Sequence, residues 1–172
     1  MGSFREKSFL RIIIKNIPII LLLVSVLNEF DFNYLGLDYF SFDFPFILIF
    51  YWSLKRNESL GYGLIFVAGM INDVVVGLPI GISSLSYLSV CVFAAYLRNI
   101  TLRPSLVKDW IFFLFTIFFI KSLIHLILVL FFSIELDYSI LMINLFFTFL
   151  MYYFLSYLFR LYLKLAFGNL ND

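Results

Sequence analysis

Three ionisable residues interrupt long apolar runs of this sequence and are its first candidates for chemistry: Asp73, Lys121 and His125. Lys121 and His125 are four residues apart and so share one face of a helix. At about 1.5 Å rise per residue, Asp73 lies roughly 21 Å along its run, and Lys121 and His125 roughly 18 and 24 Å along theirs. We therefore expect an Asp73–Lys121 ion pair with His125 as a hydrogen-bonding neighbour. Alternatively, Lys121 extends to the membrane surface or contacts a partner subunit.

The segment around Asp73 is GMINDVVVGLPIG, which places Gly69, Asp73 and Gly77 four residues apart. On a helix these positions form one face, and the glycines let a second backbone approach closely. The face predicts either a tight helix–helix contact with one buried carboxylate or an ion or substrate site. The lack of a second carboxylate at matching depth favours the helix–helix contact. Pro79 and Gly81 predict an abrupt turn after this helix.

Motifs for enzymatic chemistry are missing from the sequence. His125 is the only histidine and Cys91 the only cysteine, which excludes a histidine metal site, a cysteine zinc site and an internal disulfide. No G-x-S-x-G nucleophile motif and no G-x-x-x-x-G-K-[ST] phosphate loop is present. The carboxylates of the 29–43 segment are expected to set membrane topology and a partner surface. We predict that the protein is not an enzyme and needs no cofactor or metal.

The surroundings of these residues follow from composition. Hydrophobic residues make up 63% of the 172 residues, charged residues only 13%, and the mean hydropathy is +1.04. Soluble domains carry about 25% charged residues, and a chain of this length could not bury so much apolar surface in water. We therefore predict an all-α, polytopic membrane protein forming one domain. The net charge of +1 argues against a nucleic-acid partner.

Six stretches are candidate membrane spans, and the charges between them predict their orientation. Basic residues cluster near the N-terminus, at 55–56, at 98–108 and at 160–164, whereas the 29–43 and 134–138 loops carry acidic residues and no Lys or Arg. By the positive-inside rule, the basic segments and both termini are cytoplasmic, and the first span is expected to be uncleaved. The second stretch is short, but only a crossing there keeps the pattern consistent. The predicted spans are residues 12–28, 43–55, 60–77, 82–98, 109–133 and 139–165.

Local signals support these boundaries. Pro45, two residues after Asp43, suits a helix start, with the acid near the positive end of the helix dipole. Asp109 before Trp110 could cap the fifth helix in the same way. Trp52 and Trp110 lie near predicted membrane interfaces, where they serve as anchors or packing residues.

The stretches DFPFILIFYWSLKRNESLGYG and GMINDVVVGLPIG resemble MreD, the rod-shape-determining membrane protein family. That family shows a proline opening an apolar span that ends near Tyr-Trp, followed by G-x-x-x-D-x-x-x-G-x-P-x-G. The matching residues here are Pro45, Tyr51, Trp52, Gly69, Asp73, Gly77, Pro79 and Gly81. The resemblance is specific over residues 43–98 and extends over the rest of the chain in hydropathy and layout.

This resemblance implies a non-enzymatic inner-membrane scaffold of the cell-elongation machinery that synthesises peptidoglycan. Such a subunit would bind MreC and, through it, connect to RodA, to the class B penicillin-binding transpeptidase and indirectly to MreB. The family fold is similar to the six-helix substrate-binding subunits of energy-coupling-factor vitamin transporters. The alternative is therefore a transporter subunit with Asp73 near an outward-opening ligand pocket. The short basic loops are expected to touch anionic membrane lipid.

Overall fold

The computed structural model describes residues 16–27, 41–55, 60–101, 105–133 and 137–167. Within these ranges the chain forms six helices and no β-strand, which confirms the all-α prediction. Their bounds agree with the predicted spans to within a few residues, although the predicted start of the first span lies outside the described ranges. The helices are Asn16–Leu27, α2 (Phe44–Lys55), α3 (Tyr62–Val76), α4 (Ile82–Ile100), α5 (Leu106–Phe132) and α6 (Tyr138–Phe167).

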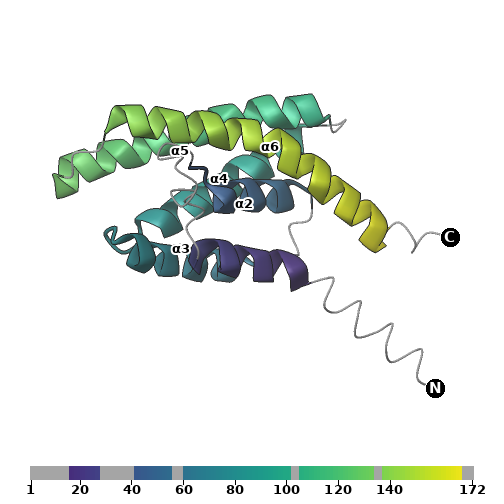
Figure 1. Cartoon of the computed structure of the whole chain (residues 1–172), viewed down its shortest axis with the longest axis horizontal. Helices are drawn as coiled ribbons and strands as arrows, with labels where there is room; N and C mark the ends of the chain where they lie inside the picture. Colours follow the sequence, from purple (N-terminus) through teal and green to yellow (C-terminus); the bar gives the residue numbers. More distant parts are fainter. Residues whose placement is uncertain (1–15, 28–40, 56–59, 102–104, 134–136, 168–172) are drawn as a thin grey trace, which may run out of the picture.

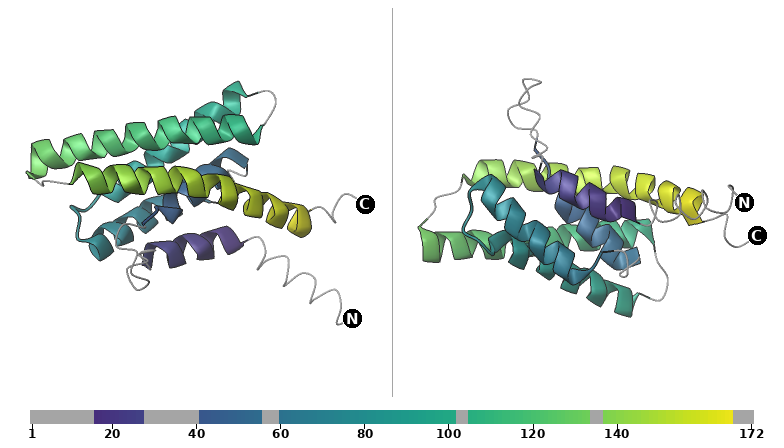
Figure 2. Two further views of the ribbon diagram at one scale, coloured as in Figure 1. Left: turned by 45° about the horizontal axis from the view of Figure 1, so that its top comes forward. Right: turned by 90° about the horizontal axis from the view of Figure 1, so that it is seen from below.

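The six helices run roughly along the long axis of the molecule and are stacked in three groups across it. Figure 1 shows α5 and α6 on one side, α2 and α4 in the middle, and α3 with the N-terminal helix on the other side, and the left view of Figure 2 agrees. Helix α4 contacts α2, α3 and α5, while α6 contacts α2 and α5. The turn between α3 and α4 lies at the same end of the molecule as Asp137, which we call the acidic end. The opposite, basic end carries Lys55 and Lys164.

Helix α2 is the centre of the bundle. Ten of its twelve residues are buried, and their side chains meet rings from both α5 and α6. Phe50 packs against Phe113 at 5.1 Å and against Tyr152 at 5.7 Å between ring centroids. Trp52 is only 1% exposed and packs against Tyr51 and Phe159, so of its two predicted roles, anchor or packing residue, the structure supports packing. Because α2 is surrounded by other helices, Trp52 is a core residue.

Among the described residues, α5 and α6 are the two helices long and apolar enough to cross a membrane, over Leu106–Phe132 and Tyr138–Lys164. The N-terminal helix, α2 and α3 are apolar but shorter. In the most apolar stretches of α5 and α6 only 28% and 22% of residues are buried inside the molecule, whereas the core helix of a soluble protein is mostly buried. These two helices indicate association with a membrane. The six-span topology remains a prediction.

Candidate functional site

Asp73 joins α3 to the start of α4. Its carboxylate is fully buried; Oδ2 accepts a hydrogen bond from the Gly81 amide at 2.6 Å and Oδ1 from the Ser83 amide at 2.8 Å. The first amides of a helix lack partners inside the helix and form the positive end of its dipole. Asp73 thus caps α4 from the preceding helix. It is used structurally, and the predicted helix–helix contact with a buried carboxylate is present.

The glycines around Asp73 have three separate roles. A Cβ placed on Gly69 would lie 2.5 Å from the Ser84 backbone nitrogen and 2.8 Å from Ser84 Oγ, so α3 and α4 touch here through backbone. Gly77 ends α3 with φ of 76°, and Gly81 precedes α4 with φ of 106°; both values lie in the left-handed region that favours glycine. Gly77 therefore terminates the helix, which corrects its predicted position on the packing face. Pro79 lies in the predicted turn.

Lys121 does not pair with Asp73, so the predicted ion pair is wrong. Its ammonium group pairs with Asp43 and also donates a hydrogen bond to Asn144 Oδ1. Asn144 in turn donates to Ser41 Oγ at 3.0 Å, and the Asp43 amide donates to Thr148 Oγ1 at 3.0 Å. These polar contacts therefore join the start of α2 to α5 and α6, whereas the carboxylate of Asp73 accepts its hydrogen bonds from the start of α4.

A second ion pair holds the other end of α2. Lys55 Nζ lies 2.6 Å from Asp109 Oδ2, and the side chain of Asp109 is only 2% exposed. Asp109 lies in the first turn of α5 after the cap residue Ser105, so its predicted capping role is wrong. The two pairs have matched spacing: Asp43 and Lys55 are twelve residues apart, as are Asp109 and Lys121. Antiparallel α2 and α5 consequently bring opposite charges together at both ends, about 18 Å apart.

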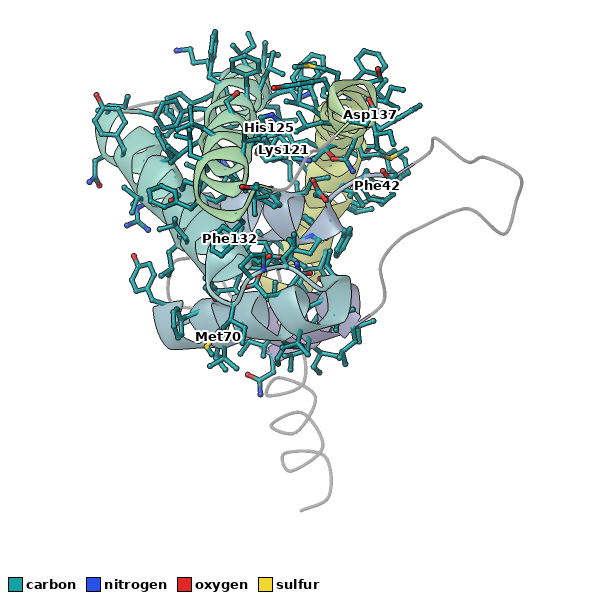
Figure 3. The ribbon with its side chains drawn as sticks, turned by 90° about the vertical axis from the view of Figure 1, so that its left-hand side faces the viewer. Phe42, Met70, Lys121, His125, Phe132 and Asp137 are labelled. Carbon is teal, nitrogen blue, oxygen red and sulfur yellow. The ribbon has the colours of Figure 1, made fainter. Side chains whose placement is uncertain are left out.

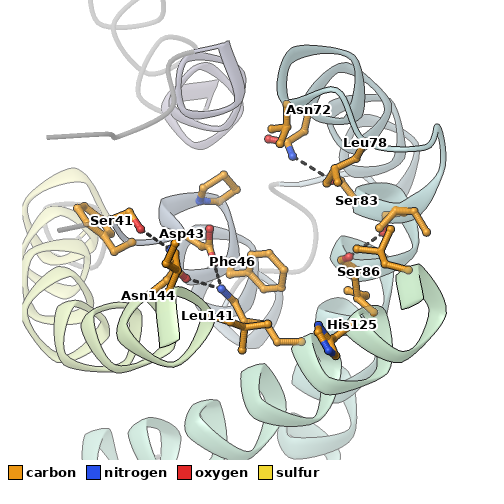
Figure 4. Close-up of a pocket in the computed structure, with 18 of the residues that line it drawn as sticks. Ser41, Asp43, Phe46, Asn72, Leu78, Ser83, Ser86, His125, Leu141 and Asn144 are labelled. Atoms are coloured by element: carbon orange, nitrogen blue, oxygen red, sulfur yellow. Dashed lines mark hydrogen bonds and ion pairs between the residues drawn. The ribbon is translucent and has the colours of Figure 1, made fainter. Parts of the chain in front are cut away.

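A cavity of about 610 Å³ lies beyond the N-terminal end of α2, toward the acidic end. Helix α2 is about 18 Å long, whereas the 27 residues of α5 extend about 40 Å. The shorter helix leaves the bundle centre unfilled above Asp43. Figure 4 shows Ser41, Asp43 and Asn144 on one side of the cavity, Asn72, Ser83 and Ser86 on the other, and His125 on α5. Asp43 thus lines a cavity at the end of α2, although the sequence suggested a role in setting topology and a partner surface.

His125 is the least satisfied polar side chain of the site. Both ring nitrogens are buried and lack a hydrogen-bond partner among the described residues, contrary to its predicted role as a hydrogen-bonding neighbour. Its ring packs against Tyr138 at 4.5 Å between centroids. His125 also lines a second hollow of about 340 Å³ between α5 and α6, and Leu141 is the other residue that lines both spaces. In Figure 3, viewed along the helices, Lys121 and His125 lie between α5 and α6, whereas Met70 lies on the outer surface of α3.

Sequence reasoning did not include Asn144, Ser41 and Thr148 in the site, and it placed Asp43 in a loop. The signal available for Asp43 was the twelve-residue acid-to-base spacing that it shares with Asp109. No comparable signal marks Asn144, which is one of several polar residues in the apolar run of α6.

In comparisons with known proteins, no family model matches the chain, and no curated protein or solved structure matches it significantly.

Proposed function

We propose that this chain is a non-enzymatic, multi-pass scaffold subunit of the bacterial cell-elongation complex in the inner membrane. The observation that carries the proposal is the geometry of the Gly69–Gly81 segment. Gly69 admits the α4 backbone, Asp73 caps α4, and Gly77 and Gly81 adopt left-handed conformations. Each of these MreD-like motif residues thus serves the α3–α4 junction. Because these motif residues hold two helices together, the motif fits a structural subunit that supports other proteins.

The charge distribution supports six crossings with the basic end toward the cytoplasm. Lys55, Arg98 and Lys164 lie in the last turns of α2, α4 and α6, and the acidic end carries Asp137. Basic residues remain on the cytoplasmic side during membrane insertion. Helix α2 is shorter than the roughly 30 Å hydrocarbon core. Its polar ends are satisfied by ion pairs with α5, so a short central helix is compatible with a membrane environment.

The outward faces of α5 and α6 offer surface for partner helices as well as for lipid. Several phenylalanines on these faces are at least half exposed. On α5 they are Phe115, Phe118 and Phe131, which are 50–77% exposed, and on α6 they are Phe146 and Phe154, which are 58% and 55% exposed. A helix that is apolar on its outward side faces lipid or another apolar helix. This fits binding of MreC and, directly or indirectly, of RodA and the penicillin-binding transpeptidase, with MreB linked indirectly.

The test is affinity purification of the tagged protein from its native membrane in mild detergent, followed by mass spectrometry. Enrichment of MreC with the wall-synthesis enzymes is the expected result, and depletion of the protein should round the cells. An Asp73→Leu variant, which removes the α4 cap, should recover less of these partners than an exposed-face control such as Val74→Leu. Recovery of neither MreC nor a wall-synthesis enzyme would overturn the scaffold proposal.

A transporter subunit that binds a vitamin or another small molecule is the second candidate, favoured by the cavity. The cavity lies toward the predicted outer side and combines Asn72, Ser83, Asn144 and Lys121 with apolar walls. Its volume is within the 300–1,000 Å³ typical of small-molecule sites. Co-purification of paired ATPases and a transmembrane coupling subunit would favour this function over the scaffold.

A further inference from the structure

We propose that the cavity above α2 binds the uncharged, hydroxyl- or amide-bearing head of a membrane amphiphile, whose acyl chain lies in the hollow between α5 and α6. This site goes beyond a scaffold role and differs from a site for a water-soluble substrate, because its occupant enters sideways from the membrane. It rests on the part of the proposed function that places the chain in a membrane.

The first argument is the position of the two spaces. The cavity is lined on α5 by Lys121, Ile124, His125 and Leu128, and on α6 by Ile140, Leu141, Ile143 and Asn144. The hollow lies along the same two helices, and His125 and Leu141 line both spaces. One boundary, made largely of two side chains, therefore separates the polar interior from the outer groove.

The second argument is the apolar character of the hollow. Its lining includes Leu126, Leu130 and Met142, which are 55%, 67% and 49% exposed. A surface of this kind on a membrane-inserted pair of helices contacts hydrocarbon. The hollow of about 340 Å³ therefore suits part of an acyl chain, and the cavity of about 610 Å³ suits a compact head together with the first carbons of that chain.

The third argument is charge, which selects the head. Two carboxylates, Asp43 and Asp137, and one ammonium, Lys121, line the cavity, so the lining apart from His125 carries a net charge of −1. Lys121 is already neutralised by Asp43. An anionic head would have to compete with Asp43 for Lys121 and would meet a second carboxylate, Asp137, in the same lining. The lining therefore favours an uncharged head.

The fourth argument is the unsatisfied imidazole. His125 leaves both ring nitrogens buried without a partner among the described residues, a state that costs free energy. A neutral imidazole has one donor and one acceptor, and a hydroxyl or a primary or secondary amide group likewise offers both a donor and an acceptor. Rotation of the ring away from Tyr138 would open the boundary toward the groove and let the nitrogens bond to the head. Ligand binding then gains hydrogen bonds that the empty site lacks.

The experiment uses the full-length purified protein and three probes. Native mass spectrometry measures the affinity of monooleoylglycerol, which has an uncharged diol head, of oleate, which has the same chain with an anionic head, and of glycerol alone. We expect saturable one-to-one binding of monooleoylglycerol, at least tenfold weaker binding of oleate, and undetectable binding of glycerol. Equal or tighter binding of oleate would overturn the charge argument, and tight binding of glycerol would overturn the role of the groove.

Two variants locate the site. His125→Phe keeps a ring against Tyr138 but removes both nitrogens, and should weaken monooleoylglycerol binding roughly tenfold, the effect of losing about 1.4 kcal/mol of hydrogen bonding. Phe115→Leu, on the exposed face of the same helix, should leave the affinity unchanged. Leu141→Trp should block the boundary and abolish binding, with folding checked by size-exclusion chromatography.

Unchanged affinity in both His125→Phe and Leu141→Trp would place the ligand elsewhere and overturn the proposal, as would a wild-type protein that binds none of the probes. Carbonate extraction of the native membranes separates this failure from failure of the proposed function. A chain released by carbonate is not integral to the membrane. A chain that resists extraction but binds no monooleoylglycerol is integral without this site.

Discussion

Gly69→Ala is the sharpest test of the α3–α4 junction, because the added methyl group would meet backbone. Its Cβ would lie 2.5 Å from the Ser84 nitrogen and 2.8 Å from Ser84 Oγ. Side chains can rotate away from such a contact, but a backbone nitrogen moves only if the helix moves. Overpacking of this kind costs about 1–3 kcal/mol, and the backbone contact favours the upper end. Subtracting a gain of about 1 kcal/mol in helix propensity leaves a net loss of about 2 kcal/mol.

Gly63→Ala is the matched control on the same helix. No described atom lies within 4 Å of a Cβ at Gly63, so the substitution should stabilise α3 by about 0.5 kcal/mol. The two variants should then differ by about 2.5 kcal/mol, or roughly 5–10 °C in the midpoint of thermal unfolding for a chain of this size. Fluorescence-detected unfolding in one detergent measures both midpoints. A Gly69→Ala midpoint equal to or above that of Gly63→Ala would refute the close contact.

Three further predictions test the Asp73 cap, the Asp43–Lys121 ion pair and the backbone conformation of Gly81. Asp73→Asn should destabilise the protein by about 1–2 kcal/mol, because a side-chain amide can accept only one of the two backbone hydrogen bonds well. Asp73→Leu should destabilise it by roughly 2–6 kcal/mol, because two buried backbone amides lose their partner. Equal unfolding midpoints for the two variants would contradict the capping role of Asp73. Asp43→Asn and Lys121→Met should be coupled by about 1–3 kcal/mol in a double-mutant cycle of unfolding free energies, whereas the cycle of Asp73→Asn with Lys121→Met should give about zero. Gly81→Ala should lower the unfolding midpoint although space is open there, because φ of 106° is strained for alanine by roughly 1–3 kcal/mol.

The helices themselves could be predicted from the sequence, because apolar length and loop charge are properties of single segments. The turn at Gly77–Gly81 followed from its glycines and proline for the same reason. The close approach at Gly69 followed from the small-residue spacing, although the sequence could not identify α4 as the neighbour. These features need only local information or a general rule about small residues.

The pairing of charges could not be predicted in the same way, because a pair depends on which helices are neighbours. Asp73 and Lys121 were matched because both lie within long apolar runs at similar distances from the predicted cytoplasmic ends. In the structure Asp73 is satisfied by amides of α4, which hydropathy does not reveal as donors. Lys121 instead contacts a carboxylate at the start of the shortest apolar run.

The shortness of α2 explains both the missed ion pair and the cavity. Twelve residues extend about 18 Å, so with Lys55 paired to Asp109 near the start of α5, Asp43 must lie about 18 Å farther along that helix. Lys121 is twelve residues beyond Asp109 and occupies that depth. The carboxylate that the sequence placed in an outer loop is therefore carried into the bundle by the length of its own helix. The space above it is then lined by the polar residues that hold the end of α2, which is why the ion pair and the candidate binding site coincide.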